Sequence, residues 1–172
     1  MKPIVQDGDP VLRESAKPVP DELFGTPELV SILKDMEEAL EREPDGVALA
    51  APQIGVPYRI FIVRFDRTRP PQEPLASPEL GVFINPVFTN ISRRREEMDE
   101  GCLSVRHVYG KTLRHERATV RAKDASGKVF ERGGGGLLAQ IYQHETDHLD
   151  GTLFTDHAMD LVTYERSHEP TS

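Results

Sequence analysis

The segment HETDH at residues 144–148 matches the pattern HExxH, whose residue types and spacing suit metal-dependent hydrolysis. Histidines four positions apart lie on one face of an α-helix, one turn apart, so His144 and His148 can bind one metal ion. Glu145 projects beside that face, where it can act as a general base without being a ligand. So short a pattern also arises by chance, and a histidine pair that binds nothing explains the motif alone equally well.

A catalytic metal site of this type needs a third protein ligand and leaves a fourth position for water. Cys102 is the candidate, because it is the single cysteine of the chain and follows a glycine in the segment EGCLS. A lone reduced cysteine is more often a small apolar side chain than a ligand. Together with the two histidines, however, its thiolate would complete a tetrahedral site that activates water near neutral pH. A single cysteine also excludes an internal disulfide and a cysteine-only zinc site.

Gln53 is the one polar side chain in a run of small apolar residues, 47–55. Burying its amide without a partner would cost about 1–3 kcal/mol. Either the amide holds its own loop together, or its NH₂ group donates a hydrogen bond to an oxyanion beside the metal. Taken alone, the residue favours the first interpretation.

The elements around these motifs predict an α+β fold, with small antiparallel or mixed sheets packed around a central helix that carries HExxH. Apolar residues recur at helical spacing over 29–40, after a capping Thr26 and Pro27, and again over 137–149. Strands are predicted at 58–65, 82–86, 88–91, 118–122 and 128–130. We expect Pro86 to end its strand, and the glycines at 133–136 to be flexible unless packing holds them.

The composition predicts one domain over residues 1–172. Its last residues, 155–172, are expected to form a polar, acidic tail. A formal net charge of −8 argues against a nucleic-acid-binding protein, which needs a basic surface. No stretch approaches the roughly 20 apolar residues that span a membrane, and the first residues lack the apolar core of a signal peptide. We therefore expect a cytoplasmic protein whose cysteine stays reduced.

Three segments together resemble the signature motifs of the peptide deformylases, which have the forms GxGxAAxQ, EGCLS and QHExDH. The corresponding segments here are GVALAAPQ at 46–53, EGCLS at 100–104 and QHETDH at 143–148. Their order and spacing match, and further similarities extend the resemblance over roughly residues 3–155. The resemblance implies an enzyme that removes the formyl group from the N-terminal formyl-methionine of nascent polypeptides.

The resemblance also implies the site. One divalent metal ion, natively Fe(II) with Zn, Ni or Co as substitutes, would be held by Cys102, His144 and His148. Glu145 would be the general base, while Gln53 and the backbone N–H of Leu103 would stabilise the oxyanion. The substrate would pair with the strand around Val47 and Leu49, and Leu137 and Ile141 would line the methionine pocket. The full set of expected substrate contacts is Gly46, Val47, Ala48, Leu49, Glu100, Gly101, Leu137 and Ile141.

The expected partners are formyl-methionyl peptides or nascent chains, with no membrane and no nucleic acid. The tail at 155–172 has four acidic residues against one arginine, so ribosome contact through a basic tail is not expected. Both a monomer and a dimer are compatible with the sequence.

Four residues at three sites depart from the family pattern. Ala48 replaces a glycine of the first motif, Arg106-His107 replaces a Pro-Gly pair, and Gln140 replaces an arginine. These changes leave two alternatives open, a divergent amidohydrolase with altered substrate preference and a non-enzymatic metal-binding homologue. A protease of the HExxH type fits poorly, because its third ligand would have to be a cysteine.

Overall fold

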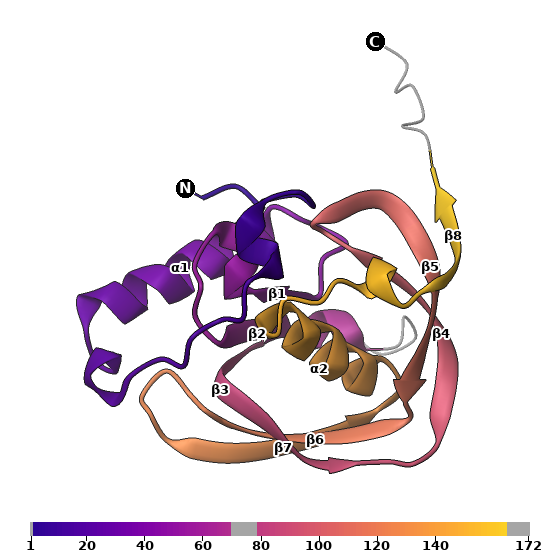
Figure 1. Ribbon diagram of the computed structural model, residues 1–172. Coiled ribbons are helices and arrows are strands. Elements are labelled where there is room, and N and C mark those ends of the chain that lie inside the picture. Colours follow the sequence, from indigo (N-terminus) through magenta and orange to yellow (C-terminus); the bar gives the residue numbers. More distant parts are fainter. Residues whose placement is uncertain (1, 70–78, 165–172) are drawn as a thin grey trace.

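The computed structural model describes residues 2–69 and 79–164, which form two antiparallel sheets and two α-helices joined by turns and short 3₁₀ segments. The larger sheet has the order β1-β2-β3-β6-β7 and the smaller sheet the order β4-β5-β8. Helix α2 lies between them, with the smaller sheet on one side and β3, β6 and β7 on another (Figure 1). The α+β prediction, with the HExxH helix at the centre, is confirmed.

The bounds of the larger sheet are β1 (Ala48–Ala50), β2 (Ile60–Arg64), β3 (Leu80–Ile91), β6 (Arg117–Lys123) and β7 (Val129–Gly135). Those of the smaller sheet are β4 (Arg95–Cys102), β5 (Val105–His115) and β8 (Met159–Thr163), and the helices are α1 (Pro27–Glu41) and α2 (Gly136–Leu149). Every strand ladder in the described part is antiparallel. The mixed sheets that we allowed for are therefore not found there, and the one parallel contact is an isolated bridge from Lys17 to Tyr58.

Helix α1 begins as its sequence predicts. The hydroxyl of Thr26 accepts a hydrogen bond from the backbone N–H of Leu29, and Pro27 occupies the first turn, where its missing N–H costs nothing. One face is buried through Leu29, Ile32, Met36, Ala39 and Leu40. That face packs against β1 and the following 3₁₀ turn (Ala51–Ile54), so the helix supports the strand that borders the site.

Helix α2 is held by an aromatic core. Tyr142 is fully buried and lies with its ring centroid 5.5 Å from that of Phe83, which stacks on Phe61 at 4.6 Å. These rings anchor the helix to β2 and β3 on the face opposite its histidines. The helix therefore presents the histidines to the smaller sheet from a rigid support.

The prediction that Pro86 ends its strand is wrong, because β3 continues to Ile91. Asn85 adopts a left-handed conformation with φ 52°, and the pairing with β6 is irregular between Ile84 and Val87. The Asn85 side chain holds this bulge in place by bonding to the backbone N–H and C=O of Val19, at 2.8 and 3.0 Å. A proline is tolerated at a bulge because its missing N–H breaks no regular ladder bond.

The glycine run is ordered rather than flexible, because packing holds it. Gly133, Gly134 and Gly135 belong to β7 and pair with β6. A Cβ atom on Gly134 would lie 2.8 Å from Cβ of Leu138, and one on Gly133 would lie 2.8 Å from Oγ1 of Thr119. The missing side chains therefore let α2 and β6 approach this strand closely.

Strands β4, β5 and β8 were absent from our sequence-based prediction. Strand β8 lies in the segment that composition marks as an acidic tail, of which residues 165–172 are outside the described part. Within the described residues, no helix combines the length and apolar character needed to cross a membrane.

Candidate functional site

The three predicted metal ligands meet at the junction of the smaller sheet and α2. Sγ of Cys102, at the end of β4, lies 3.3 Å from Nε2 of His148, which lies 3.2 Å from Nε2 of His144. One ligand atom from each residue lies within 4.8 Å of the others. A thiolate with two imidazoles is a donor set that suits zinc and other divalent transition metals. The residues therefore fit the metal ion that the sequence predicts.

The ring of His144 is oriented by Glu100, whose Oε2 lies 2.9 Å from Nδ1. Glu100 and Arg114 are both almost fully buried and form an ion pair at 2.5 Å. Although burial would raise the pKa of Glu100, its hydrogen bonds with His144 and Arg114 hold that pKa well below its usual value. The carboxylate is therefore ionised and accepts the Nδ1 hydrogen, which leaves Nε2 free to bind a metal.

A buried polar network fixes the Glu100 carboxylate from several sides. Oε1 accepts hydrogen bonds from Nε of Arg114 at 2.9 Å, Oγ1 of Thr112 at 3.1 Å and Nε2 of Gln140 at 3.2 Å. Arg114 also bonds Asp147 on α2 at 2.7 Å. The network thus joins β4, β5 and α2 behind the first histidine.

The pKa values of His144 and His148 are shifted in opposite directions. Burial and the neighbouring His144 lower the pKa of His148 well below its ordinary value. Burial would also lower the pKa of His144, but hydrogen bonds with Cys102 and Glu100 raise it well above that value. A metal binds a histidine through an unprotonated nitrogen, so binding of a metal would favour the neutral form of both rings.

Glu145 lies beside the trio and lines the adjoining cleft. Its Oε2 is buried and has no hydrogen-bond partner among the described residues. Burial raises the pKa of Glu145 to about 7. A carboxylate with a free oxygen in this position can take up and release a proton near neutral pH.

Gln53 performs the structural role that its sequence favours and also faces the ligands. Its Oε1 accepts a hydrogen bond from the backbone N–H of Ala50 at 2.9 Å, which stabilises the 3₁₀ turn after β1. Its Nε2 donates to Oγ of Ser104 at 3.0 Å and lies 3.8 Å from Sγ of Cys102. The two interpretations of this residue are therefore compatible.

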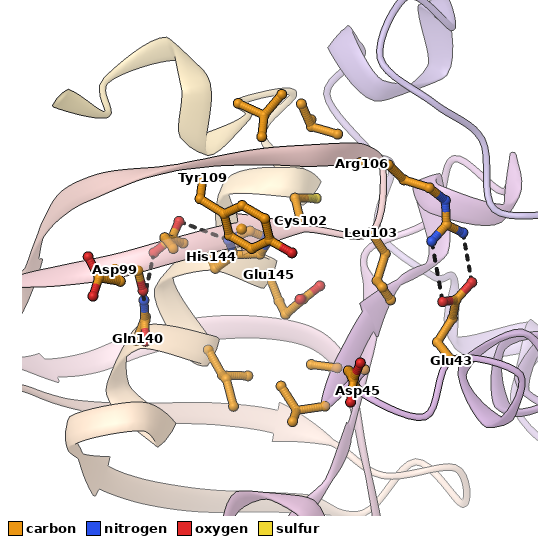
Figure 2. Close-up of a pocket in the computed structure, with 18 of the residues that line it drawn as sticks. Glu43, Asp45, Asp99, Cys102, Leu103, Arg106, Tyr109, Gln140, His144 and Glu145 are labelled. Carbon is orange, nitrogen blue, oxygen red and sulfur yellow. Dashed lines mark hydrogen bonds and ion pairs between the residues drawn. The ribbon is translucent and has the colours of Figure 1, made fainter. Parts of the chain in front are cut away.

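A cleft of about 450 Å³ opens beside the ligands, between β1, β4–β5 and α2. Figure 2 shows Tyr109 over His144 and Glu145 on one side of the cleft, and Arg106 with Glu43 at the other side. Of the predicted substrate contacts, the structure places these in the lining: Gly46, Val47, Ala48, Glu100, Gly101, Leu137 and Ile141. Leu49 is not among them, because its side chain is fully buried in the core beside α1.

The glycine of the EGCLS segment makes room for Tyr109. A Cβ atom on Gly101 would lie 2.8 Å from Cε1 of the Tyr109 ring. The turn that follows is held from the other side, because Nε2 of Gln6 donates to the carbonyl of Leu103 at 3.0 Å. Cys102 therefore sits on a backbone fixed from two directions.

Comparison with known proteins identifies this arrangement. The model of the polypeptide deformylase family matches residues 1–163. The chain belongs to the polypeptide deformylase family. Peptide deformylase 1 of Nitrosomonas europaea is 40% identical over 162 residues, which cover 94% of this chain and 89% of that protein.

Solved deformylases have the same fold. The Met-Ala-Ser-bound class I type b peptide deformylase of Acinetobacter baumannii is 31% identical, with a TM-score of 0.81 over 91% of this chain and 99% of that one. A peptide deformylase of Legionella pneumophila is 36% identical, with a TM-score of 0.80 over 93% and 87% of the two chains.

Within this deformylase fold, sequence analysis missed the residues behind His144. Arg114 and Thr112 are buried polar residues of β5, and neither stands out in the sequence, since charged residues are usually exposed. Gln140, noted only as a departure from the family pattern, donates to Glu100 and to the backbone carbonyl of Asp99. One general rule could have predicted part of this network. A histidine that binds a metal usually donates its other ring N–H to a carboxylate, and Glu100 is the carboxylate beside the predicted cysteine ligand.

Proposed function

We propose that this protein is a peptide deformylase in which water cleaves the formyl–methionine amide of N-formylated polypeptides, giving formate and a free N-terminal amine. The observation that carries the proposal is the convergence of one thiol and two imidazoles beside the free, buried oxygen of Glu145. A divalent metal ion held by Cys102, His144 and His148 would act as a Lewis acid and lower the pKa of water.

Glu145 is the general base in this proposal. It takes the proton of the attacking water and then delivers it to the amine of methionine as the C–N bond breaks. The pKa of about 7, which burial produces, suits a group that must both accept and donate a proton at neutral pH.

Gln53 and the backbone N–H of Leu103 are the proposed donors to the oxyanion that forms on the formyl carbon. The Gln53 amide is pre-oriented, because its oxygen is held by Ala50 and its nitrogen is directed toward Cys102. Such fixed donors stabilise a developing negative charge without reorganising.

The substrate backbone is proposed to pair with β1, which is one of the two edge strands of the larger sheet. Leu137 and Ile141 lie about one helical turn apart on α2, and both line the cleft. They are proposed to form apolar walls for the methionine side chain. Leu49 would contribute through its backbone alone, because its side chain faces the core.

We propose Fe(II) as the native metal, with Zn, Ni or Co as substitutes, since cysteine and histidine ligands accept all of them. The proposed compartment is the cytoplasm, where the thiol stays reduced. The proposed partners are nascent chains, reached without a basic C-terminal tail.

The test is anaerobic turnover of formyl-Met-Ala-Ser by Fe(II)- or Co(II)-loaded protein, with metal analysis of the same sample. We expect Glu145→Gln to lower kcat about 10²–10⁴-fold while one metal ion per chain is retained. Glu116→Gln, at a half-buried position outside the cleft lining, is the control and should turn over like the wild type. Full activity in Glu145→Gln would show that the assigned base is wrong.

A second candidate is a related amidohydrolase with an altered substrate preference, which Ala48 favours. Ala48 belongs to the cleft lining and is also part of the buried core, at a position where the family pattern has glycine. A large gain in formyl-Met-Ala-Ser turnover by Ala48→Gly would support this candidate. Comparable turnover by both forms would support the first proposal.

A further inference from the structure

An ion pair closes one side of the cleft. Nη2 of Arg106, on β5, lies 2.7 Å from Oε1 of Glu43, in the loop after α1, and Nη1 lies 3.3 Å from Oε2. The ion pair is therefore bidentate. It connects β5, on one wall of the cleft, to the loop before β1, on the other wall (Figure 2). Arg106 is one of the residues that depart from the family pattern.

The position of this pair follows from the direction of β1. Gln53 lies beside Cys102, and the chain leads back from it through Ala48 and Gly46 to Glu43. A peptide whose formyl group lies at the ligands and whose backbone pairs with β1 therefore leaves the cleft toward Glu43 and Arg106. The residues after methionine must pass this pair.

The end of the cleft at Glu43, Asp45 and Arg106 is called the exit here, and its charges do not cancel. Arg106 neutralises Glu43, whereas Asp45 is exposed, lines the cleft and has no ion-pair partner among the described residues. Farther along the lining, Asp99 is paired with Lys111 at 3.0 Å. Among the described residues, the carboxylate of Asp45 is therefore the unpaired charge of the lining at this exit.

The ion pairs behind the loop that carries Glu43 and Asp45 are balanced in charge. Arg64 pairs with Glu41 and Asp66, and Arg67 also contacts Glu41. Arg67 Nη1 donates to the backbone carbonyls of Glu43 and Gly46, at 3.0 and 2.8 Å. The charges of these four side chains sum to zero. Arg42, which precedes Glu43, is exposed, lies outside the cleft lining and donates to the backbone carbonyl of Lys2 at 2.7 Å. Asp45 is therefore the charge of the lining to test.

We propose that Arg106, Glu43 and Asp45 determine the charge specificity of this enzyme for the residues after formyl-methionine. The exit selects basic residues over acidic ones, and Arg106 limits this preference by neutralising Glu43. The inference rests on the proposed deformylase function and adds specificity-determining residues to it. Fixed charges at the mouth of a cleft raise the local concentration of oppositely charged ligands.

The experiment compares kcat/KM for three C-terminally amidated peptides, formyl-Met-Ala-Lys-Ser, formyl-Met-Ala-Gln-Ser and formyl-Met-Ala-Glu-Ser. We expect the wild type to prefer the lysine peptide to the glutamate peptide by about three- to tenfold at low salt. Arg106→Gln should increase this ratio by a similar factor, because it exposes the charge of Glu43. Asp45→Asn should bring the ratio close to one, and Glu43→Gln with Asp45→Asn should reverse it. Raising the salt to about 1 M should reduce every ratio toward one.

The control is Arg121→Gln, which breaks a more exposed ion pair between β6 and β7, with Glu131 at 2.8 Å. It should leave the ratio unchanged. If Arg106 only supports the loop, its substitution would change turnover of all three peptides equally, and a constant ratio would overturn the inference. Failure of the wild type to hydrolyse even the glutamine peptide would instead contradict the proposed function.

Discussion

The carboxylate of Glu100 and the ring of His144 are joined across the interface between β4 and α2, with Oε2 2.9 Å from Nδ1. Sequence resemblance placed Glu100 among the substrate contacts. Glu100 does line the cleft, and its carboxylate contacts both His144 and Arg114, so we expect it to hold the ring of that histidine. The following predictions depend on this and related contacts.

Glu100→Gln should lower the affinity for Co(II) or Ni(II) about 10–100-fold, because a neutral amide orients the imidazole less strongly. Competition with a chromophoric chelator measures the affinity directly. Glu97→Gln, on an exposed position of the same strand, should bind as the wild type does. Equal affinities in the two variants would exclude a role for Glu100 in metal binding.

Arg114→Leu should lower the free energy of unfolding of the metal-free protein by about 3–5 kcal/mol, since it leaves Glu100 buried without its counter-ion. Urea denaturation of wild type and variant measures the loss. Arg121→Leu, which breaks an exposed pair, should cost no more than about 1 kcal/mol. A small loss in Arg114→Leu would mean that the pair is not required for folding.

Gly134→Ala should destabilise the protein by about 1–3 kcal/mol, because the new methyl group would press on the backbone-proximal Cβ of Leu138 at 2.8 Å. Gly135→Ala is the matched control. Its nearest neighbours would lie at 3.5 Å and its φ of −120° is ordinary extended backbone. Thermal unfolding of the two variants should therefore differ, and equal losses would contradict the packing explanation of the glycine run.

Asp66→Asn should destabilise the protein at pH 7 by about 1–2 kcal/mol and much less at pH 2. Hydrogen bonds from Arg64, at 3.0 and 2.9 Å, lower the pKa of Asp66 below its ordinary 3.8. A depressed folded-state pKa stabilises the protein above the unfolded value, and this contribution disappears as pH falls through the folded value. Urea denaturation at the two pH values tests the prediction, and a loss independent of pH would contradict it.

Removing the metal with a chelator should lower the thermal midpoint of the wild type, because the metal binds the folded form. Cys102→Ala should show a lower midpoint that no longer responds to the chelator. Glu145→Gln should keep the response, since Glu145 is not a ligand in this proposal. An unchanged wild-type midpoint would show that the metal contributes nothing to folding stability.

The sequence best predicted the helices and the grouping of Cys102, His144 and His148. Apolar spacing identified α1 and α2, and the four-residue separation of His144 and His148 indicated their common face. The strands β4 and β5 escaped prediction, because charged residues occupy both of their faces and hide the alternation that marks a strand. Arg114 escaped for the same reason, since nothing local distinguishes a buried ion pair from an exposed one.

Two errors had a physical cause that only the tertiary structure supplies. Pro86 stays within β3 because Asn85 forms a bulge and is held by Val19, which is distant in sequence. The glycines of β7 are ordered by Leu138 and Thr119, which belong to neighbouring elements. Local propensity carries no information about either contact.

The arrangement of the ligands also has a kinetic consequence. Cys102 and His148 are 46 residues apart, and they belong to the smaller sheet and to α2 respectively. Their close approach requires the sheet and the helix to dock, so we expect the site to form after the local hydrogen bonds of α2. In refolding with Co(II) present, the thiolate-to-cobalt absorption band should therefore appear later than the far-ultraviolet signal of the helices. The band would then report the time at which the smaller sheet and α2 dock.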